Sequence, residues 1–273
     1  MHSGRSRTLT HTILIVGSMV AAAPIVGVTL IAFDAPNSPA AGVSFSGDMG
    51  FANFEQTWRQ GGFGSSLTWS AVIAAVTVAI TLVTSVPAGF AFANIRFPGR
   101  SPLFLLVLFG LLLPAPAILI PMYYELRTVS LTGTMWSVIL PQSAASVAFG
   151  VFWMRAVFYG VPRELLEAAR VDGAATRDVF ARVALPLVRS PVFALILFTF
   201  LWCWNAFMLP LIMLAGSSIQ TAPLSLANFQ GQHVSDIPGE AASAVFVFLP
   251  MVILYVLTQR RFVRGLTEGG LKM

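Results

Sequence analysis

The chain alternates long apolar stretches with short polar segments, and this alternation predicts membrane-spanning helices. A helix of about 20 predominantly apolar residues crosses the hydrocarbon core of a bilayer. Six stretches approach or exceed this length: Ile13–Phe33, Leu67–Ala93, Ser101–Met122, Met135–Met154, Ser190–Leu214 and Ala241–Leu257. The pattern therefore predicts an all-α polytopic membrane protein with six transmembrane helices, organised as a single domain over residues 1–273. In the third stretch, Pro114, Pro116 and Pro121 predict kinks, and neighbouring helices would have to satisfy the backbone carbonyls that these kinks free.

Composition and the placement of charge agree with this prediction. Only 10% of the residues are charged and 56% are hydrophobic, whereas a soluble domain has about a quarter charged residues. Fourteen of the sixteen Lys and Arg residues fall in the termini and in alternate loops. Because cytoplasmic loops are enriched in Lys and Arg, both termini and the loop at 160–190 are expected in the cytoplasm. The segment 34–66, rich in Gly, Pro and Ser, is expected to be an external loop.

The first apolar stretch has two interpretations. Arg5 and Arg7 precede it, and Ala21–Ala23 offers the small residues of a signal-peptide cleavage site. However, the apolar run continues well past Ala23, and cleavage would leave Pro24 at the new terminus. A membrane anchor is therefore favoured over a cleaved signal peptide.

The longest charged segment between apolar stretches begins with a predicted amphipathic helix. Pro162 suits the first turn of a helix, where its missing N–H has no intrahelical partner, and Glu164 follows where negative charge is favoured. On a 3.6-residue period, one arc is apolar and a neighbouring stripe is charged. The apolar arc comprises Leu165, Leu166 and Ala169, and the charged stripe comprises Arg163, Glu167 and Arg170.

A sharp turn and a second short helix are predicted to follow. Gly173 lies where a residue with positive φ would end the first helix. Thr176 is expected to cap a second helix that carries Asp178 in its first turn and stops at Pro186. Two short helices joined by a tight turn would thus project from the cytoplasmic ends of the spans.

These residues resemble a known family. The spacing of Glu167-Ala168-Ala169, then Gly173, then Val183-Ala184-Leu185-Pro186 resembles the EAA loop of permease subunits of bacterial ABC importers. With Asp172 before Gly173, it is most similar to the carbohydrate-uptake branch, the maltose-type permeases. The segments Phe51-Ala52-Asn53-Phe54, Phe97-Pro98-Gly99-Arg100 and Gln259-Arg260-Arg261-Phe262-Val263 extend the resemblance over about residues 51–265.

The resemblance implies a fold, partners and a coupling site. The fold would be that of a type I ABC importer permease. The partners would be a second permease in a heterodimer, two cytoplasmic ATPase subunits and an extracytoplasmic solute-binding protein, all acting at a bacterial cell membrane. In that family the EAA loop docks on the ATPase, which assigns ATPase coupling to Glu167, Ala168, Ala169, Asp172, Gly173, Leu185 and Pro186.

The sequence offers little support for chemistry in this chain. Its one lysine, Lys272, follows no glycine-rich loop, so a Walker A nucleotide site is excluded and ATP and Mg²⁺ are expected in partner subunits. The histidines are scattered over a terminus and a loop, which leaves no pattern for a metal site or a catalytic triad. Neither a catalytic nor a nucleic-acid function is predicted.

Two transport functions fit the six stretches. The first is a permease subunit that moves a sugar or related polar solute inward by alternating access coupled to ATP hydrolysis in its partners. The alternative is a stand-alone secondary transporter or uniporter, but ion-coupled transporters usually carry ionisable residues inside the membrane and the stretches contain none. Trp204 and Asn205 are candidate substrate-path residues, because tryptophan stacks on sugar rings and an amide bonds hydroxyls. Packing or an interfacial position is the alternative for the tryptophan.

Overall fold

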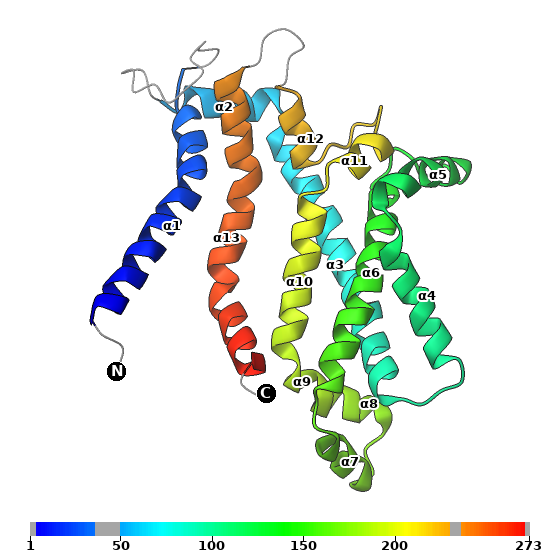
Figure 1. Cartoon of the computed structure of the whole chain (residues 1–273). Helices are drawn as coiled ribbons and strands as arrows, with labels where there is room; N and C mark the ends of the chain where they lie inside the picture. The colour runs from blue at the N-terminus through cyan, green and yellow to red at the C-terminus, as the bar shows by residue number, and fades with distance from the viewer. Residues whose placement is uncertain (1–3, 36–49, 230–235, 271–273) are drawn as a thin grey trace. The chain divides into compact units, whose positions relative to one another are not determined.

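The computed structural model describes residues 4–35, 50–229 and 236–270, and the regular structure in these ranges is entirely helical (Figure 1). Four long helices carry apolar segments able to cross a membrane. They are α1 (Gly4–Ile31), α3 (Phe63–Asn94), α6 (Trp136–Tyr159) and α13 (Ile237–Gly270). The predicted all-α class is confirmed.

The internal contacts of the chain group into two compact units. One comprises Met1–Ser66 and Ala222–Met251, and the other Leu67–Thr221 and Val252–Met273. Helices α3 and α13 therefore contribute to both units. The single domain expected over residues 1–273 stays a prediction.

The first unit is held together around α2 (Ala52–Gln60), with α1, α12 (Ala222–Ala227) and the start of α13. Asn53 is buried, and its amide donates hydrogen bonds to the carbonyl oxygens of Ala32, at 2.9 Å, and Pro238, at 2.8 Å. One side chain thus satisfies two backbone acceptors from segments far apart in the sequence. Phenylalanine rings pack around this junction: Phe33, Phe54, Phe63 and Phe246.

The segment 34–66, predicted as an external loop, contains helix α2 and the start of α3 in its second half. The apolar period fails to show α2 since the residues that this helix buries, Asn53 and Thr57, are polar. Residues 36–49 of that loop lie outside the described ranges.

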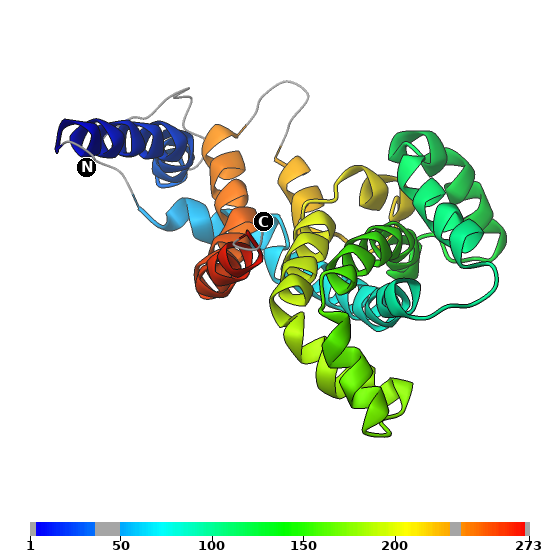
Figure 2. The ribbon, with the colours of Figure 1, turned by 60° about the horizontal axis from the view of Figure 1, so that its bottom comes forward.

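In the second unit, α3, α6 and α10 (Arg189–Trp204) run side by side, and α4 (Arg100–Leu112) packs on α6 (Figures 1 and 2). Two glycines allow the helices to approach closely. A Cβ on Gly89 would lie 2.5 Å from the Cβ of Met154, and one on Gly150 would lie 2.5 Å from the Oγ of Ser85. Small residues at such contacts are typical of helix packing in membranes.

Two of the six predicted spans are broken rather than continuous. The third divides into α4 and α5 (Ala115–Thr128), which meet at an angle above 40°. Leu113 is extended, with φ −72° and ψ 121°, because the residue before a proline is pushed out of the helical region by the Pro114 ring. The prolines therefore end a helix where the sequence predicted a kink.

The predicted fifth span ends early. Its helix α10 stops at Trp204, and a break separates it from α11 (Met208–Met213). A second bent pair, Thr176–Leu187 with Arg189–Trp204, completes a set of up to six spans by length and composition. The segment 215–240, between the fifth and sixth predicted spans, contains α12 and the start of α13 in its described part.

Candidate coupling helix and its surroundings

Helix α7 (Arg163–Val171) lies where the sequence predicted an amphipathic helix. Pro162 is its N-cap and Glu164 lies in its first turn. Leu166 is only 2% exposed and Ala169 packs beside it, as expected. Leu165 was predicted on the same buried arc but is 47% exposed, and Val171 at the end of the helix is 88% exposed. The helix therefore presents two large apolar side chains among its charges.

The turn after α7 confirms the conformation predicted for Gly173. Its φ is +83°, in the left-handed region, and a Cβ at this position would meet nothing within 4 Å. The Gly173 N–H donates to the carbonyl of Arg170, and the Ala174 N–H donates to that of Ala169, both at 3.0 Å. This pair of bonds is the Schellman motif, which satisfies carbonyls that a helix end leaves free.

The second helix starts one residue earlier than predicted and is built differently. It comprises α8 (Thr176–Asp178), a π-helical segment (Val179–Ala184) and α9 (Leu185–Leu187). Ala175, not Thr176, is the N-cap, and no side chain caps it. The helix also continues past Pro186 instead of stopping there. Proline has no N–H to donate to the carbonyl four residues earlier. The π turn directly before Pro186 already departs from this i→i−4 pattern, so the helix tolerates the proline.

One hydrophobic core joins these two helices to the membrane spans. Leu166 and Val179 pack in the same cluster as residues near the ends of α3, α6 and α10. The buried members from those three helices are Val86, Phe90, Ala93, Met154, Phe158 and Leu195. Since close-packed interiors transmit displacement, a force on α7 would reach three spans through direct contacts.

A cavity of about 460 Å³ lies between α7 and the end of α3. The charged stripe predicted on α7 lines one side of it with Arg163, Glu167 and Arg170. Arg96 and Arg100, from the turn between α3 and α4, line it as well. In the sequence, the signal for this placement is that both arginines directly follow the end of a predicted span.

Arg100 is held in place by several acceptors. Its guanidinium donates to the carbonyls of Ala93, at 3.3 Å, and Ile95, at 3.4 Å, and to the hydroxyl of Tyr159. Arg100 thereby closes the C-terminal end of α3, where carbonyl groups lack helical partners. By contrast, among the described residues, the side chains of Arg96, Arg163, Glu167 and Arg170 have neither a hydrogen bond nor an ion pair.

The remaining predicted coupling residues spread along the same two helices. Ala168 and Asp172 are exposed, whereas Leu185 and Pro186 are half-buried and Leu185 touches the common core. The structure thus brings the seven residues into one helical hairpin, with some facing outward and others packing.

The two substrate-path candidates differ in accessibility. Trp204 is 3% exposed and stacks on Phe200, with ring centroids 5.3 Å apart. Asn205 is exposed at the C-terminal cap of α10, and its Nδ2 donates to the carbonyl of Leu201 at 2.8 Å. Trp202, two residues earlier, is 59% exposed and packs edge-on against Phe149.

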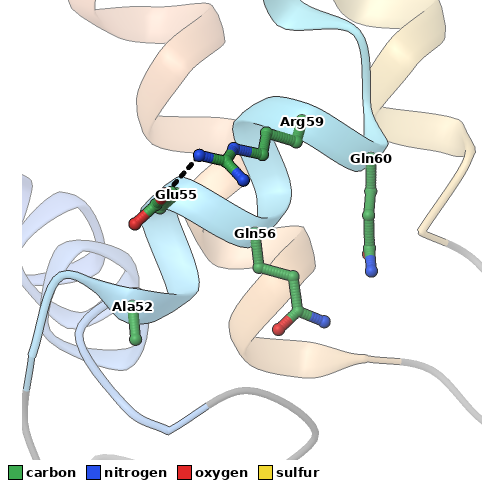
Figure 3. A pocket seen from close by; sticks show the side chains of 5 residues that line it. All are labelled: Ala52, Glu55, Gln56, Arg59 and Gln60. Carbon is green, nitrogen blue, oxygen red and sulfur yellow. Dashed lines mark ion pairs between the residues drawn. The ribbon is translucent and has the colours of Figure 1, made fainter.

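A second cavity, of about 350 Å³, lies along α2 in the other unit. Figure 3 shows its lining side chains: Glu55 and Arg59 point toward each other, and Gln56 and Gln60 extend from the same helix. The ion pair spans 2.7 Å, but both side chains are largely exposed, so it contributes little to stability. Nothing in this lining indicates a reaction.

The fold and the exposed helical hairpin define a class: a multi-pass helical membrane protein with a short amphipathic helix outside its spans. The family of binding-protein-dependent transport system inner membrane components matches residues 85–268, and the chain belongs to this family. It is therefore a permease subunit of the ABC-transporter type, as the sequence predicted.

Relatives and a solved structure agree with this assignment. The chain is 35% identical to the arabinooligosaccharides transport system permease protein AraQ of Halalkalibacterium halodurans, over 79% of this chain and 74% of that protein. It is 30% identical to the trehalose transport system permease protein SugB of Mycobacterium tuberculosis, over 81% and 82% of the two chains. A crystal structure of a bacterial ABC transporter involved in alginate import contains a chain of the same fold, with a TM-score of 0.78, 19% identity, and coverage of 96% of this chain and 99% of that one. The predicted ABC importer permease fold is thus confirmed.

Proposed function

We propose that this chain is the transmembrane subunit that moves a sugar or a related polar solute into a bacterial cell, by alternating access driven by ATP hydrolysis in partner subunits. The names of its relatives, which concern arabinooligosaccharides and trehalose, support a carbohydrate substrate. Membership of the ABC permease family does not favour a stand-alone secondary transporter or uniporter. The protein would lie in the cell membrane with both termini in the cytoplasm.

The partners in this proposal are a second permease, two ATPase subunits and an extracytoplasmic solute-binding protein. ATP and Mg²⁺ would bind to the ATPases, and this chain would bind neither. This chain would transmit the movement of the ATPases to the membrane spans.

The observation that carries the proposal is the surface of α7. A short helix with seven charged or large apolar residues exposes Leu165 and Val171, which have no counterpart to cover them among the described residues. Exposed apolar side chains on a charged element are typical of a protein-binding surface. The Schellman turn at Gly173 fixes the direction of the following helix, so the hairpin is preformed for docking.

The coupling would pass through the common core. When the ATPases close, α7 and the helix after it would move as one body, because Leu166 and Val179 share a core with α3, α6 and α10. The spans would then tilt between inward-open and outward-open states. Asn205, exposed at the end of α10, would meet the solute on its path; Trp204 would do so only in a state that uncovers it.

Reconstitution tests this proposal. The chain, co-expressed with the transporter subunits encoded by neighbouring genes, should co-purify with an ATPase, and uptake into proteoliposomes should require ATP and the solute-binding protein. Uptake that is driven by an ion gradient and persists without ATP would favour the secondary transporter instead.

A further inference from the structure

The cavity between α3, α4 and α7 is strongly positive. Four arginines and one carboxylate, that of Glu167, line it. The guanidinium groups of Arg96, Arg163 and Arg170 have no bonding partner among the described residues. Unpaired guanidinium groups around one space favour an anion with several acceptor oxygens, and phosphate suits the fork geometry of arginine.

The position of the cavity relative to the membrane indicates which molecule would supply that anion. Ala93, Asn94 and Ile95, which end α3, and Arg100, which begins α4, line the cavity. Helix α3 is long and apolar enough to cross the bilayer. With the predicted topology, the cavity would lie where this span meets the cytoplasmic surface, at the level of the lipid headgroups.

Beyond the cavity, α4 exposes apolar side chains. Leu103 and Leu106 follow Arg100 at intervals of three residues, so the three lie on one side of the helix. Both leucines are exposed in this chain. A molecule whose phosphate is bound at Arg96, in the turn before α4, would place an attached hydrocarbon chain against these two side chains.

We propose that this cavity binds the phosphate group of an anionic lipid of the inner leaflet, with its acyl chains along α4. Three arginines are free to bind the phosphate, while Arg100 is anchored by the end of α3 and fixes the position of the site. Because Arg163, Glu167 and Arg170 also belong to α7, the lipid would brace the coupling helix against α3. A soluble acidic segment of another protein would use the arginines but not the leucines.

The test measures lipid binding to the purified complex by native mass spectrometry. Short-chain phosphatidylglycerol is titrated against phosphatidylcholine of the same chain length, and inorganic phosphate is added as a separate competitor. The variant Arg96→Gln/Arg163→Gln removes two free arginines and leaves Arg100, which holds the backbone. The control Arg177→Gln/Arg182→Gln removes the same charge from the helix that follows α7, outside the cavity.

The wild-type complex and the control should prefer phosphatidylglycerol, and the cavity variant should bind it about 25-fold more weakly, at about fivefold for each of the two arginines removed. Equal binding of the two lipids, or a cavity variant that binds like the control, would overturn the proposal. Displacement of phosphatidylglycerol by inorganic phosphate, at the same concentrations at which the lipid saturates the complex, would also overturn it. A cavity variant that loses its ATPase subunits but keeps its preference for phosphatidylglycerol would assign the arginines to a protein partner.

Discussion

A substitution at Gly173 should change the docking geometry of the hairpin while leaving the rest of the protein stable. Its φ of +83° disfavours any side chain, and a β-branched one most. A Cβ in the left-handed region costs about 1–2 kcal/mol. No atom lies within 4 Å of the added Cβ, so the effect of Gly173→Val is backbone strain rather than a clash.

That strain sets the expected magnitude. The chain can relieve it by leaving the left-handed conformation, which turns the second helix away from its direction in the docked hairpin. To bind the ATPase, the variant must return to the left-handed conformation and pay about 1–2 kcal/mol of strain. Because about 1.4 kcal/mol corresponds to a factor of ten, ATPase binding should be about 5- to 30-fold weaker. Insertion into the membrane should be unaffected.

The assay is co-purification of the ATPase with the tagged permease across a range of ATPase concentrations, together with solute uptake. Gly216→Val is the matched control: Gly216 has φ +76° and also has nothing near its Cβ position, but it follows α11, away from α7. Gly173→Asn should be milder, because asparagine tolerates the left-handed region better. Equal ATPase binding by Gly173→Val and Gly216→Val would refute the reasoning.

Three further predictions concern charge, substrate and topology. Glu167→Ala should reduce ATPase co-purification and abolish uptake, since truncating one member of a shielded charge pair at an interface costs about 2–5 kcal/mol. Charge reversal at Arg177, an exposed loop residue, should reduce both much less. Equal effects of the two changes would contradict a specific role for Glu167. Asn205→Ala should lower uptake while assembly and receptor-stimulated ATP hydrolysis persist, because its 2.8 Å bond to a helix-end carbonyl contributes only about 1 kcal/mol; unchanged uptake would leave Asn205 as a capping residue. A reporter active only outside the cytoplasm should work when fused near Gly231 and fail near Ala175, and activity at Ala175 would overturn the topology.

The sequence predicted most strongly the features that local physics controls. The apolar runs that became α1, α3, α6 and α13 were visible from length and composition alone. Gly173 was predicted to adopt positive φ from its position after an amphipathic turn, and the Schellman bonds agree.

Features that depend on tertiary contacts were missed. Helix α2 buries Asn53 because two distant carbonyls need a donor, which no periodicity can reveal. The exposure of Leu165 depends on where the neighbouring helices end. The cavity requires the turn after α3 to lie beside α7, which are far apart in the sequence.

The central claim is that α7 binds the ATPase, and site-specific cross-linking from Val171 tests it most directly. The chain has one cysteine, Cys203, which is buried, so a variant with Cys203→Ser and Val171→Cys offers one exposed thiol for a photoactivatable probe. Val171 is the most exposed large apolar residue of the hairpin. In the assembled complex, the probe should cross-link to the ATPase, with a yield that changes when ATP is added, and a probe at Val129, exposed in the loop after α5, should not. Cross-linking from Val171 to lipid alone, in a complex that contains the ATPase, would contradict the account.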